Sequence, residues 1–141
     1  MKNTQTDTYT MNNRTVTILV AAGKDTVFDF LSNIENLPAW ATEFCEELKK
    51  EGGHYKVVTS GGELFFRIDA DRKTGVVDMF AGPTLNQMGI FPSRVIMMPG
   101  GATAVSFTFF QPPDMPDEVY ERQYKSLLIE MNGLKRRFGL K

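Results

Sequence analysis

The stretch PDEVYERQYKSLLIEMNGLKRRF, residues 116–138, decides the fold of this chain. Acidic residues near its start and basic residues near its end suit the dipole of an α-helix. Gly133 within it costs about 1 kcal/mol relative to Ala. Large apolar side chains recur every four or three residues, on one helical face; they are Tyr120, Tyr124, Leu127, Met131, Leu134 and Phe138. The stretch therefore predicts a long helix with one apolar stripe, which needs a second layer to cover it.

The middle of the chain predicts that second layer, a series of antiparallel strands. Runs of alternating polar and apolar residues are separated by Gly-Gly pairs and other turn signals, which suit tight hairpins. We expect a loop at residues 82–89 and a turn at the PGG of residues 99–101. The expected strands are residues 15–21, 44–51, 54–60, 63–71, 76–81, 89–98 and 103–111.

Turn positions fix the register of each hairpin, and the register fixes the face on which each side chain lies. Two-residue loops at the Gly-Gly pairs and a three-residue PGG loop each leave one face mostly apolar. In the strand at residues 76–81, Val77 and Met79 face inward and Asp78 faces outward. The predicted cross-strand pairs are Leu48–Val57, Val57–Phe66, Tyr55–Ile68, Ser93–Phe107, Val95–Val105, Phe91–Phe109 and Met97–Thr103.

Two short helices are expected between the first two strands. Residues 24–33 carry apolar side chains at helical spacing, and Pro38 suits the first turn of a helix at residues 34–41. Trp40, the one tryptophan of the chain, lies in this second helix. We therefore predict an α+β fold in which the long helix packs across the apolar face of an antiparallel sheet.

Length and composition indicate one globular domain, at residues 14–141, after a flexible tail at residues 1–13. A chain of 141 residues can bury a substantial core. A net charge of −1 and a pI near 5.8 lack the basic footprint of a nucleic-acid binder. A lone cysteine excludes an internal disulfide, and the N-terminal sequence lacks the pattern of a signal peptide. The longest nearby apolar run is too short for a membrane span, so we expect a cytoplasmic protein.

No metal or cofactor site is predicted. A zinc site needs several nitrogen or sulfur ligands, whereas the chain has one His and one Cys. The predicted register places Cys45 opposite Ser60 and His54 opposite Glu51, too far apart for a catalytic pair. The glycine-rich stretches lack the strand–GxxxxGK[ST]–helix context of a phosphate-binding loop.

The layout resembles the SRPBCC (START-like) helix-grip superfamily over roughly residues 14–139. The resemblance is carried by VFDFLSNIENLPAWA at residues 27–41, by DADRKTGVVD at residues 69–78, and by the terminal helix. The first of these is similar to the helix–Trp segment of the polyketide cyclase/dehydrase-like branch. The resemblance implies a curved sheet that wraps around the long helix and encloses a cavity. It also implies that the two short helices plug one end of the sheet, where Trp40 covers the cavity end.

Inward-facing residues are expected to line that cavity and to contact a small hydrophobic or aromatic ligand. Tyrosine hydroxyls could orient a ligand carbonyl or hydroxyl, or could bond to the backbone or to one another. Trp40 could likewise be a core plug without ligand contact. The expected ligand-binding residues are Trp40, Tyr55, Phe66, Met79, Phe91, Ser93, Met97, Phe107, Tyr120, Tyr124 and Met131.

Two carboxylates are candidate acid–base groups. Glu46 alternates with Phe44 and Leu48, which places it on the inward face near a strand end, where burial would raise its pKa; alternatively it reaches solvent. Asp78 points inward only if the register of its strand slips. The basic run at residues 135–137 has a sufficient explanation in the helix dipole.

Three hypotheses follow. The first is a binder of a small lipid-like or polyketide-like molecule between the sheet and the C-terminal helix. The second is an enzyme of the polyketide cyclase/dehydratase type that uses Glu46 or Asp78. The third is a protein-interaction module, as in superfamily members that regulate a chaperone ATPase. A homodimer is an arrangement that the sequence leaves open.

Overall fold

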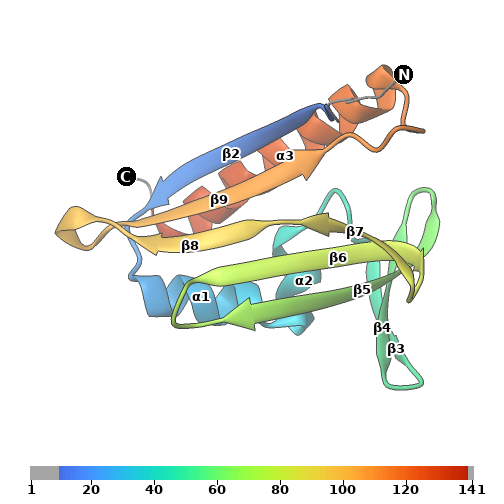
Figure 1. The fold of residues 1–141 in the computed structure, drawn as a ribbon. Helices are drawn as coiled ribbons and strands as arrows, with labels where there is room; N and C mark the ends of the chain where they lie inside the picture. The colour runs from blue at the N-terminus through green and yellow to red at the C-terminus, as the bar shows by residue number, and fades with distance from the viewer. Residues whose placement is uncertain (1–9, 140–141) are drawn as a thin grey trace, which may run out of the picture.

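A computed structural model describes residues 10–139. These residues form an eight-stranded antiparallel sheet and a long C-terminal helix, with short helices after the first strand (Figure 1). The elements are β2 (Asn13–Val20), α1 (Lys24–Ser32), the 3-10 helix η1 (Ile34–Asn36), α2 (Leu37–Trp40), β3 (Glu47–Glu51), β4 (His54–Thr59), β5 (Gly62–Asp71), β6 (Val76–Thr84), β7 (Gln87–Phe91), β8 (Ser93–Met97), the 3-10 turn η2 (Pro99–Gly101), β9 (Thr103–Phe110) and α3 (Asp117–Phe138).

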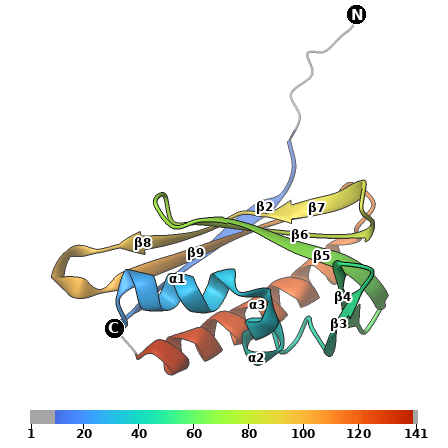
Figure 2. The same cartoon turned by 90° about the horizontal axis from the view of Figure 1, so that it is seen from below.

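The molecule has two layers. The strand order is β2-β9-β8-β6-β5-β4-β3, and β7 pairs with β6. Figure 2 shows α1, α2 and α3 on one side of this sheet, with β3 and β4 bending toward them. The predicted α+β helix-grip architecture is therefore confirmed. None of the helices in residues 10–139 is both long and apolar enough to cross a membrane.

The apolar stripe of α3 is buried against the sheet, as predicted. Leu127, Met131 and Leu134 lie in the core, and Tyr124 and Phe138 are partly buried at its margin. From the sheet, Val57, Val77 and Val95 complete this core with exposed fractions of 0%, 0% and 1%. Full burial of such side chains contributes about 1.5–3 kcal/mol each, so these two faces account for the packing of the layers.

The predicted hairpin registers are right at two turns and displaced at a third. Leu48 pairs with Val57 and Val95 with Val105, as expected. In the β4–β5 hairpin, however, Tyr55 pairs with Phe66 instead of Ile68. The loop there is Ser60–Gly61, and the Thr59 hydroxyl accepts the Gly61 N–H at 3.1 Å. Because the displacement is two residues, every side chain keeps its predicted face.

The strand prediction differs most from the structure in three places. The expected loop at residues 82–89 is instead a tight, bulged hairpin between β6 and β7. At Gly82 a Cβ would lie 1.8 Å from the Gln87 carbonyl oxygen, so this close approach requires glycine. Pro92 separates β7 from β8, because proline has no N–H for a sheet ladder. Finally, β3 begins at Glu47, after a turn in which the Cys45 N–H donates to the Ala41 carbonyl at 2.8 Å.

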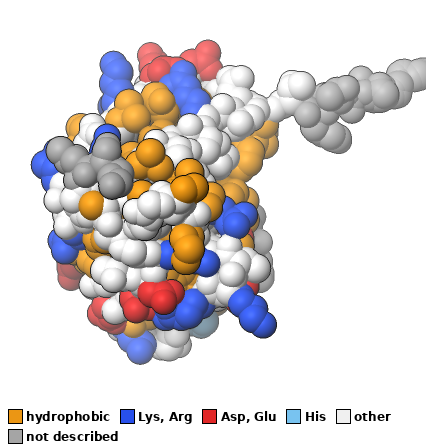
Figure 3. All heavy atoms as spheres, turned by 90° about the vertical axis from the view of Figure 1, so that its left-hand side faces the viewer, with side chains coloured by type: hydrophobic (Ala, Val, Ile, Leu, Met, Phe, Trp, Pro, Cys, Tyr) orange, Lys and Arg blue, Asp and Glu red, His pale blue; other side chains and the backbone are white. Residues whose placement is uncertain are grey.

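The tip of the β8–β9 hairpin projects beyond the helices (Figures 1 and 2). Met97, expected to face the interior, lies there with 70% of its surface exposed, although its predicted pairing with Thr103 is confirmed. The prediction of a buried Met97 is wrong: it keeps its predicted partner but is exposed in the last position of β8, although Thr103 opposite it is fully buried. Figure 3 shows this end of the molecule, where apolar side chains gather between charged groups; Leu19 and Ile96 are also exposed.

Candidate functional site: a groove between α2 and α3

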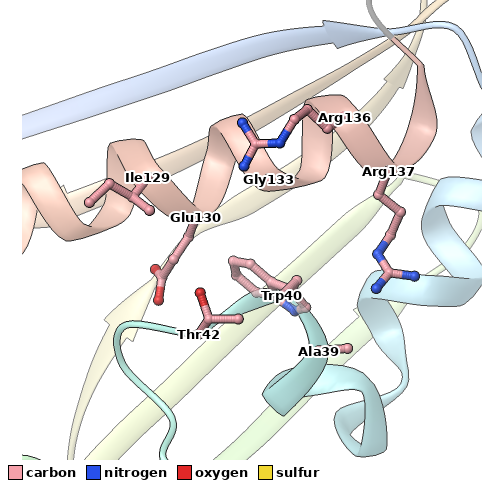
Figure 4. Close-up of a pocket in the computed structure, with 8 residues that line it drawn as sticks. All are labelled: Ala39, Trp40, Thr42, Ile129, Glu130, Gly133, Arg136 and Arg137. Atoms are coloured by element: carbon pink, nitrogen blue, oxygen red, sulfur yellow. The ribbon is translucent and has the colours of Figure 1, made fainter.

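A groove of about 460 Å³ lies between α2 and the C-terminal half of α3 (Figure 4). This volume is within the range of about 300–1,000 Å³ that is usual for small-molecule sites. The groove is lined by Ala39, Trp40, Thr42, Ile129, Glu130, Gly133, Arg136 and Arg137. The α3 residues among them recur every three or four positions, so they form a second face beside the stripe that packs on the sheet.

Trp40 joins the groove to the core. Pro38 lies in the first turn of α2, and this short helix ends at Trp40. The tryptophan is 6% exposed, and its ring meets Phe107 of β9 edge-on at 6.3 Å between centroids. It also forms part of the groove wall. The two interpretations of Trp40, core plug and candidate ligand contact, are therefore compatible in this structure.

Glu130 is the buried carboxylate of the groove. Its Oε2 accepts the backbone N–H groups of Glu43 and Phe44 at 3.0 and 2.9 Å. Both amides belong to the segment between α2 and β3, so this carboxylate fastens that segment to α3. Its other oxygen, Oε1, accepts no hydrogen bond from a residue within the described part of the chain.

Burial of Glu130 favours its neutral form. It is 6% exposed, and this burial raises its pKa from 4.5 to about 7. The two backbone N–H groups act in the opposite direction, because they stabilise the carboxylate, while the charge of nearby Glu43 raises the pKa further. A carboxyl with such a pKa can both donate and accept a proton near neutrality.

Two arginines also line the groove: Arg137 lies at the end away from Glu130, and the Arg136 side chain lies back along α3 beside Gly133 (Figure 4). Neither Arg136 nor Arg137 has a carboxylate within 4.0 Å among residues 10–139. The Arg137 guanidinium lies 4.5 Å from the centroid of the Phe30 ring on α1, a cation–π arrangement that leaves its N–H edges available. Figure 4 shows Trp40 between Glu130 and Arg137.

Gly133 lies on α3 between these charged ends. A Cβ at this position would meet nothing closer than the Arg136 side chain, at 3.9 Å. Packing within the described residues therefore does not require a glycine here, although glycine within a helix costs about 1 kcal/mol relative to Ala. Its effect is to leave space in the groove.

The predicted tyrosines lie outside this groove. The Tyr55 hydroxyl donates to Glu35, and the Tyr120 hydroxyl donates to the Phe109 carbonyl at 2.8 Å. Tyr124 is partly buried under the Arg14 guanidinium, at 4.3 Å from the ring centroid. The hydroxyls of Tyr55 and Tyr120 are therefore hydrogen-bonded to other groups of the protein.

Tyr120 also borders a smaller groove of about 310 Å³, near the start of α3. Its polar groups are engaged with one another: the Gln111 amide donates to Asp117 and to the Met115 carbonyl, both at 2.8 Å. Asn12 in turn donates to Gln111 at 2.7 Å. This network explains the buried glutamine as a connection between β9 and α3.

The other expected ligand contacts form the packed layer between sheet and helices. Phe91 stacks on Phe107 at 6.0 Å, and Phe44 lies 6.0 Å from Phe66. Ser93 is 2% exposed within β8. The predicted contacts that are buried in this layer are Phe66, Met79, Ser93 and Met131, while Phe91 and Phe107 are partly buried. Their role in ligand binding stays a prediction.

Neither proposed acid–base residue faces the groove. Glu46 is exposed, so its predicted inward orientation is wrong: the chain turns before β3 begins, and the alternation assumed for residues 44–48 does not apply. Asp78 is partly buried and pairs with Asp69, while its neighbours Val77 and Met79 fill the core. The register of β6 has not slipped, and Asp78 lies on the outer face.

Glu130 and Gly133 were not among the predicted site residues. The sequence did hold a signal for Glu130, because it follows Leu127 by three residues and precedes Leu134 by four. A charged side chain at such spacing lies at the edge of a buried stripe, where it needs a partner. The partners, backbone amides from the segment after α2, are visible only in the tertiary structure.

Solved structures share this fold at low sequence identity. The Aha1 dimer from Colwellia psychrerythraea has a TM-score of 0.67 and 18% identity, over 91% of this chain and 96% of that chain. Zhui aromatase/cyclase from Streptomyces sp. R1128 has a TM-score of 0.62 and 17% identity, over 90% of each chain. A START superfamily protein from Mycobacterium smegmatis has a TM-score of 0.61 and 16% identity, over 89% of this chain and 96% of that chain.

These likenesses confirm the helix-grip fold of START-like proteins for this chain. No protein-family model and no curated protein matches the sequence. At such identities a shared fold carries no particular reaction or ligand.

Proposed function

We propose that this helix-grip protein binds a small, mainly apolar molecule in the groove between α2 and α3. The observation that carries the proposal is a groove of about 460 Å³ that combines an indole wall with a few polar groups at its ends. Small-molecule sites are typically apolar cavities with a few orienting polar groups. The folds of the START superfamily protein and of the aromatase/cyclase support a role of this kind.

The location differs from the expected one, between the sheet and the long helix. There the Phe109 and Tyr120 rings stack at 4.7 Å, and Phe107 contacts both Phe91 and Trp40. The groove adjoins this aromatic layer through Trp40. A ligand in the groove would therefore contact the indole without displacing the core.

Filling the groove tests this proposal. Gly133→Leu places a branched side chain where no described backbone is close, so the fold should persist while ligand space is lost. A thermal-shift screen of aromatic acids, flavonoids and fatty acids should find compounds that raise the melting midpoint of the wild type and not of Gly133→Leu. Gly133→Ala is the matched control. Compounds that stabilise both proteins equally would place binding elsewhere.

A cyclase/dehydratase-type reaction is the second candidate, and Glu130 is the observation that favours it. Its pKa of about 7 suits a general acid or base, whereas Glu46 and Asp78 lie outside the groove. A poly-β-ketone mimic should be dehydrated or cyclised by the wild type and not by Glu130→Gln, which cannot transfer a proton. Equal turnover by both proteins would remove this candidate.

A protein-interaction role and a homodimer remain hypotheses, supported only by the shared fold of the Aha1 dimer. The exposed apolar end of the β8–β9 hairpin is where a second chain could be tested. Light scattering at increasing protein concentration measures dimerisation, and Met97→Lys should reduce it if that end is the interface.

A further inference from the structure

We infer that the groove is built for a planar aromatic acid with a hydroxyl at its far end, lying along Trp40 between Arg137 and Glu130. This inference rests on the proposed function, because it assigns a chemical class and an orientation to the ligand of the same groove. It is carried by charge and shape: Arg137 at one end and Arg136 beside Gly133, neither with a described acid partner, and a buried carboxyl with one unused oxygen at the other end.

The basic end selects an anion. Arg136 and Arg137 both line the groove, and no described acid neutralises them. Phe30 holds the Arg137 guanidinium by its face, so its edge can donate two parallel hydrogen bonds to a carboxylate. Arg136 and Arg137 offset the negative end of the α3 dipole, so an anion can bind near this end of the helix.

The Glu130 end selects a hydroxyl. Because Oε2 already accepts two backbone N–H groups, the negative charge is held there, and a bound proton resides on Oε1. Oε1 then donates to a ligand oxygen, and in the ionised state it accepts from a ligand hydroxyl. A ligand hydroxyl can hydrogen-bond to Oε1 in both protonation states of Glu130, because it can accept and donate. A ligand ether or carbonyl can only accept, so it pairs only with the protonated form.

The spacing sets the length of the ligand. Seven residues separate Glu130 from Arg137 in the helix, which is about 10 Å at 1.5 Å per residue. Gly133 adds no side chain between them, although the Arg136 guanidinium lies 3.9 Å from the position of a Cβ there, and the exposed part of the Trp40 indole forms part of the wall. A fused two-ring system with its polar groups at opposite ends spans this distance and contacts the exposed part of the Trp40 indole, which is 6% of its surface.

Three matched probes test the inference: the linear hydroxynaphthoate with polar groups at opposite ends, naphthoate without the hydroxyl, and naphthol without the carboxylate. Affinities are measured by titration calorimetry on the full chain. Hydroxynaphthoate should bind about tenfold or more tightly than naphthol, as a charge-assisted contact implies. It should also bind about threefold to tenfold more tightly than naphthoate, as a neutral hydrogen bond implies.

The double variant Arg136→Gln/Arg137→Gln should weaken both acids about tenfold or more and leave naphthol unchanged. The matched control is Arg122→Gln/Lys125→Gln, which removes the same charge from exposed positions of α3 outside the groove. Melting curves of both variants establish that they are folded.

The outcomes separate the two proposals. If all three probes bind with equal affinity and the arginine variant changes none of them, the ligand class is wrong although the groove binds. If the acids weaken equally in the control variant, the effect is net charge and the assignment to Arg136 and Arg137 is wrong. If no probe binds although the thermal-shift screen finds compounds that require the groove, the ligand class alone is wrong. If the probes bind Gly133→Leu as well as wild type, both this inference and the proposed groove are overturned.

Discussion

The side chain of Glu130 on α3 accepts the backbone N–H of Phe44 at 2.9 Å, across 86 positions of sequence. One contact thus serves two purposes. It fastens the segment between α2 and β3 to the long helix, and it holds a carboxyl group at the end of the α2–α3 groove. A structural test of Glu130 must therefore separate anchoring from ligand chemistry.

Two substitutions at Glu130 make that separation. The carbonyl of Glu130→Gln can still accept both N–H groups, so the free energy of unfolding at pH 4, where Glu130 is itself neutral, should change little. Glu130→Leu leaves two part-buried N–H groups without their acceptor, and we expect a loss of about 2 kcal/mol. Urea denaturation measures both, and amide exchange at Phe44 should accelerate in the Leu variant alone. Equal stability of the two variants would show that the hydrogen bonds contribute nothing to anchoring.

The protonation of Glu130 should also make stability depend on pH. Its folded pKa of about 7 lies above the 4.5 of an ordinary glutamate, so the folded state binds the proton more tightly than the unfolded chain does. The resulting stabilisation is fully present below pH 4.5 and decreases as the pH rises to about 7, by about 3 kcal/mol in total. Denaturation series from pH 4 to pH 8 measure it, and Glu130→Gln should remove that slope.

Other groups near Glu130 also affect its pKa. Glu43, from the adjoining segment, raises its pKa, and the two backbone N–H groups lower it. Burial raises the pKa of the nearby Cys45 thiol, and the Glu130 charge raises it further; Arg136 and Arg137 line the same groove. Glu43→Gln should therefore shift the midpoint of the stability change to lower pH, and an unchanged midpoint would contradict this cause.

Gly133→Ala should stabilise the protein by about 1 kcal/mol. The new methyl group meets no described atom closer than 3.9 Å, and alanine has the higher helix propensity. Thermal and urea unfolding check the increase. Asn132→Ala, at an exposed neighbouring position of α3, is the comparison for propensity alone. A loss of stability in Gly133→Ala would mean that the glycine is needed for packing.

Trp40 should report on ligand binding through its fluorescence, since it is the one tryptophan of the chain. An aromatic ligand in the groove, in contact with the indole, should quench or shift the emission of the wild type, and should not do so in Gly133→Leu. Trp40→Ala should cost about 3–5 kcal/mol, because the indole also packs on Phe107. Emission that no groove-dependent ligand alters would argue that Trp40 is a core residue only.

Met97 and Met131 should respond in opposite ways to substitution. Met97 is 70% exposed, so Met97→Ala should change the free energy of unfolding by less than about 0.5 kcal/mol. Met131 is 1% exposed, so Met131→Ala should cost about 2–5 kcal/mol. Urea unfolding of the two variants checks the contrast. A large loss at Met97 would indicate that another surface covers it.

The sequence by itself determined the fold, because local periodicity defines which faces are apolar. The stripe of α3, the inward orientation of Val77 and Met79, and the β8–β9 register all follow from spacing and turn residues. Even the displaced register of β4 and β5 kept its faces, since the displacement was two residues. Because alternate residues share a face, a shift of two residues leaves the same side chains buried, and the predicted fold is unchanged.

The tertiary structure alone decided the site. Two backbone amides from the segment after α2 hydrogen-bond to the buried Glu130 carboxyl. Met97 is exposed in a hairpin whose tip projects beyond the helices. Glu46 is exposed because the chain turns before β3 begins. A site depends on single side chains from distant elements meeting within hydrogen-bonding distance, and no local period encodes that meeting.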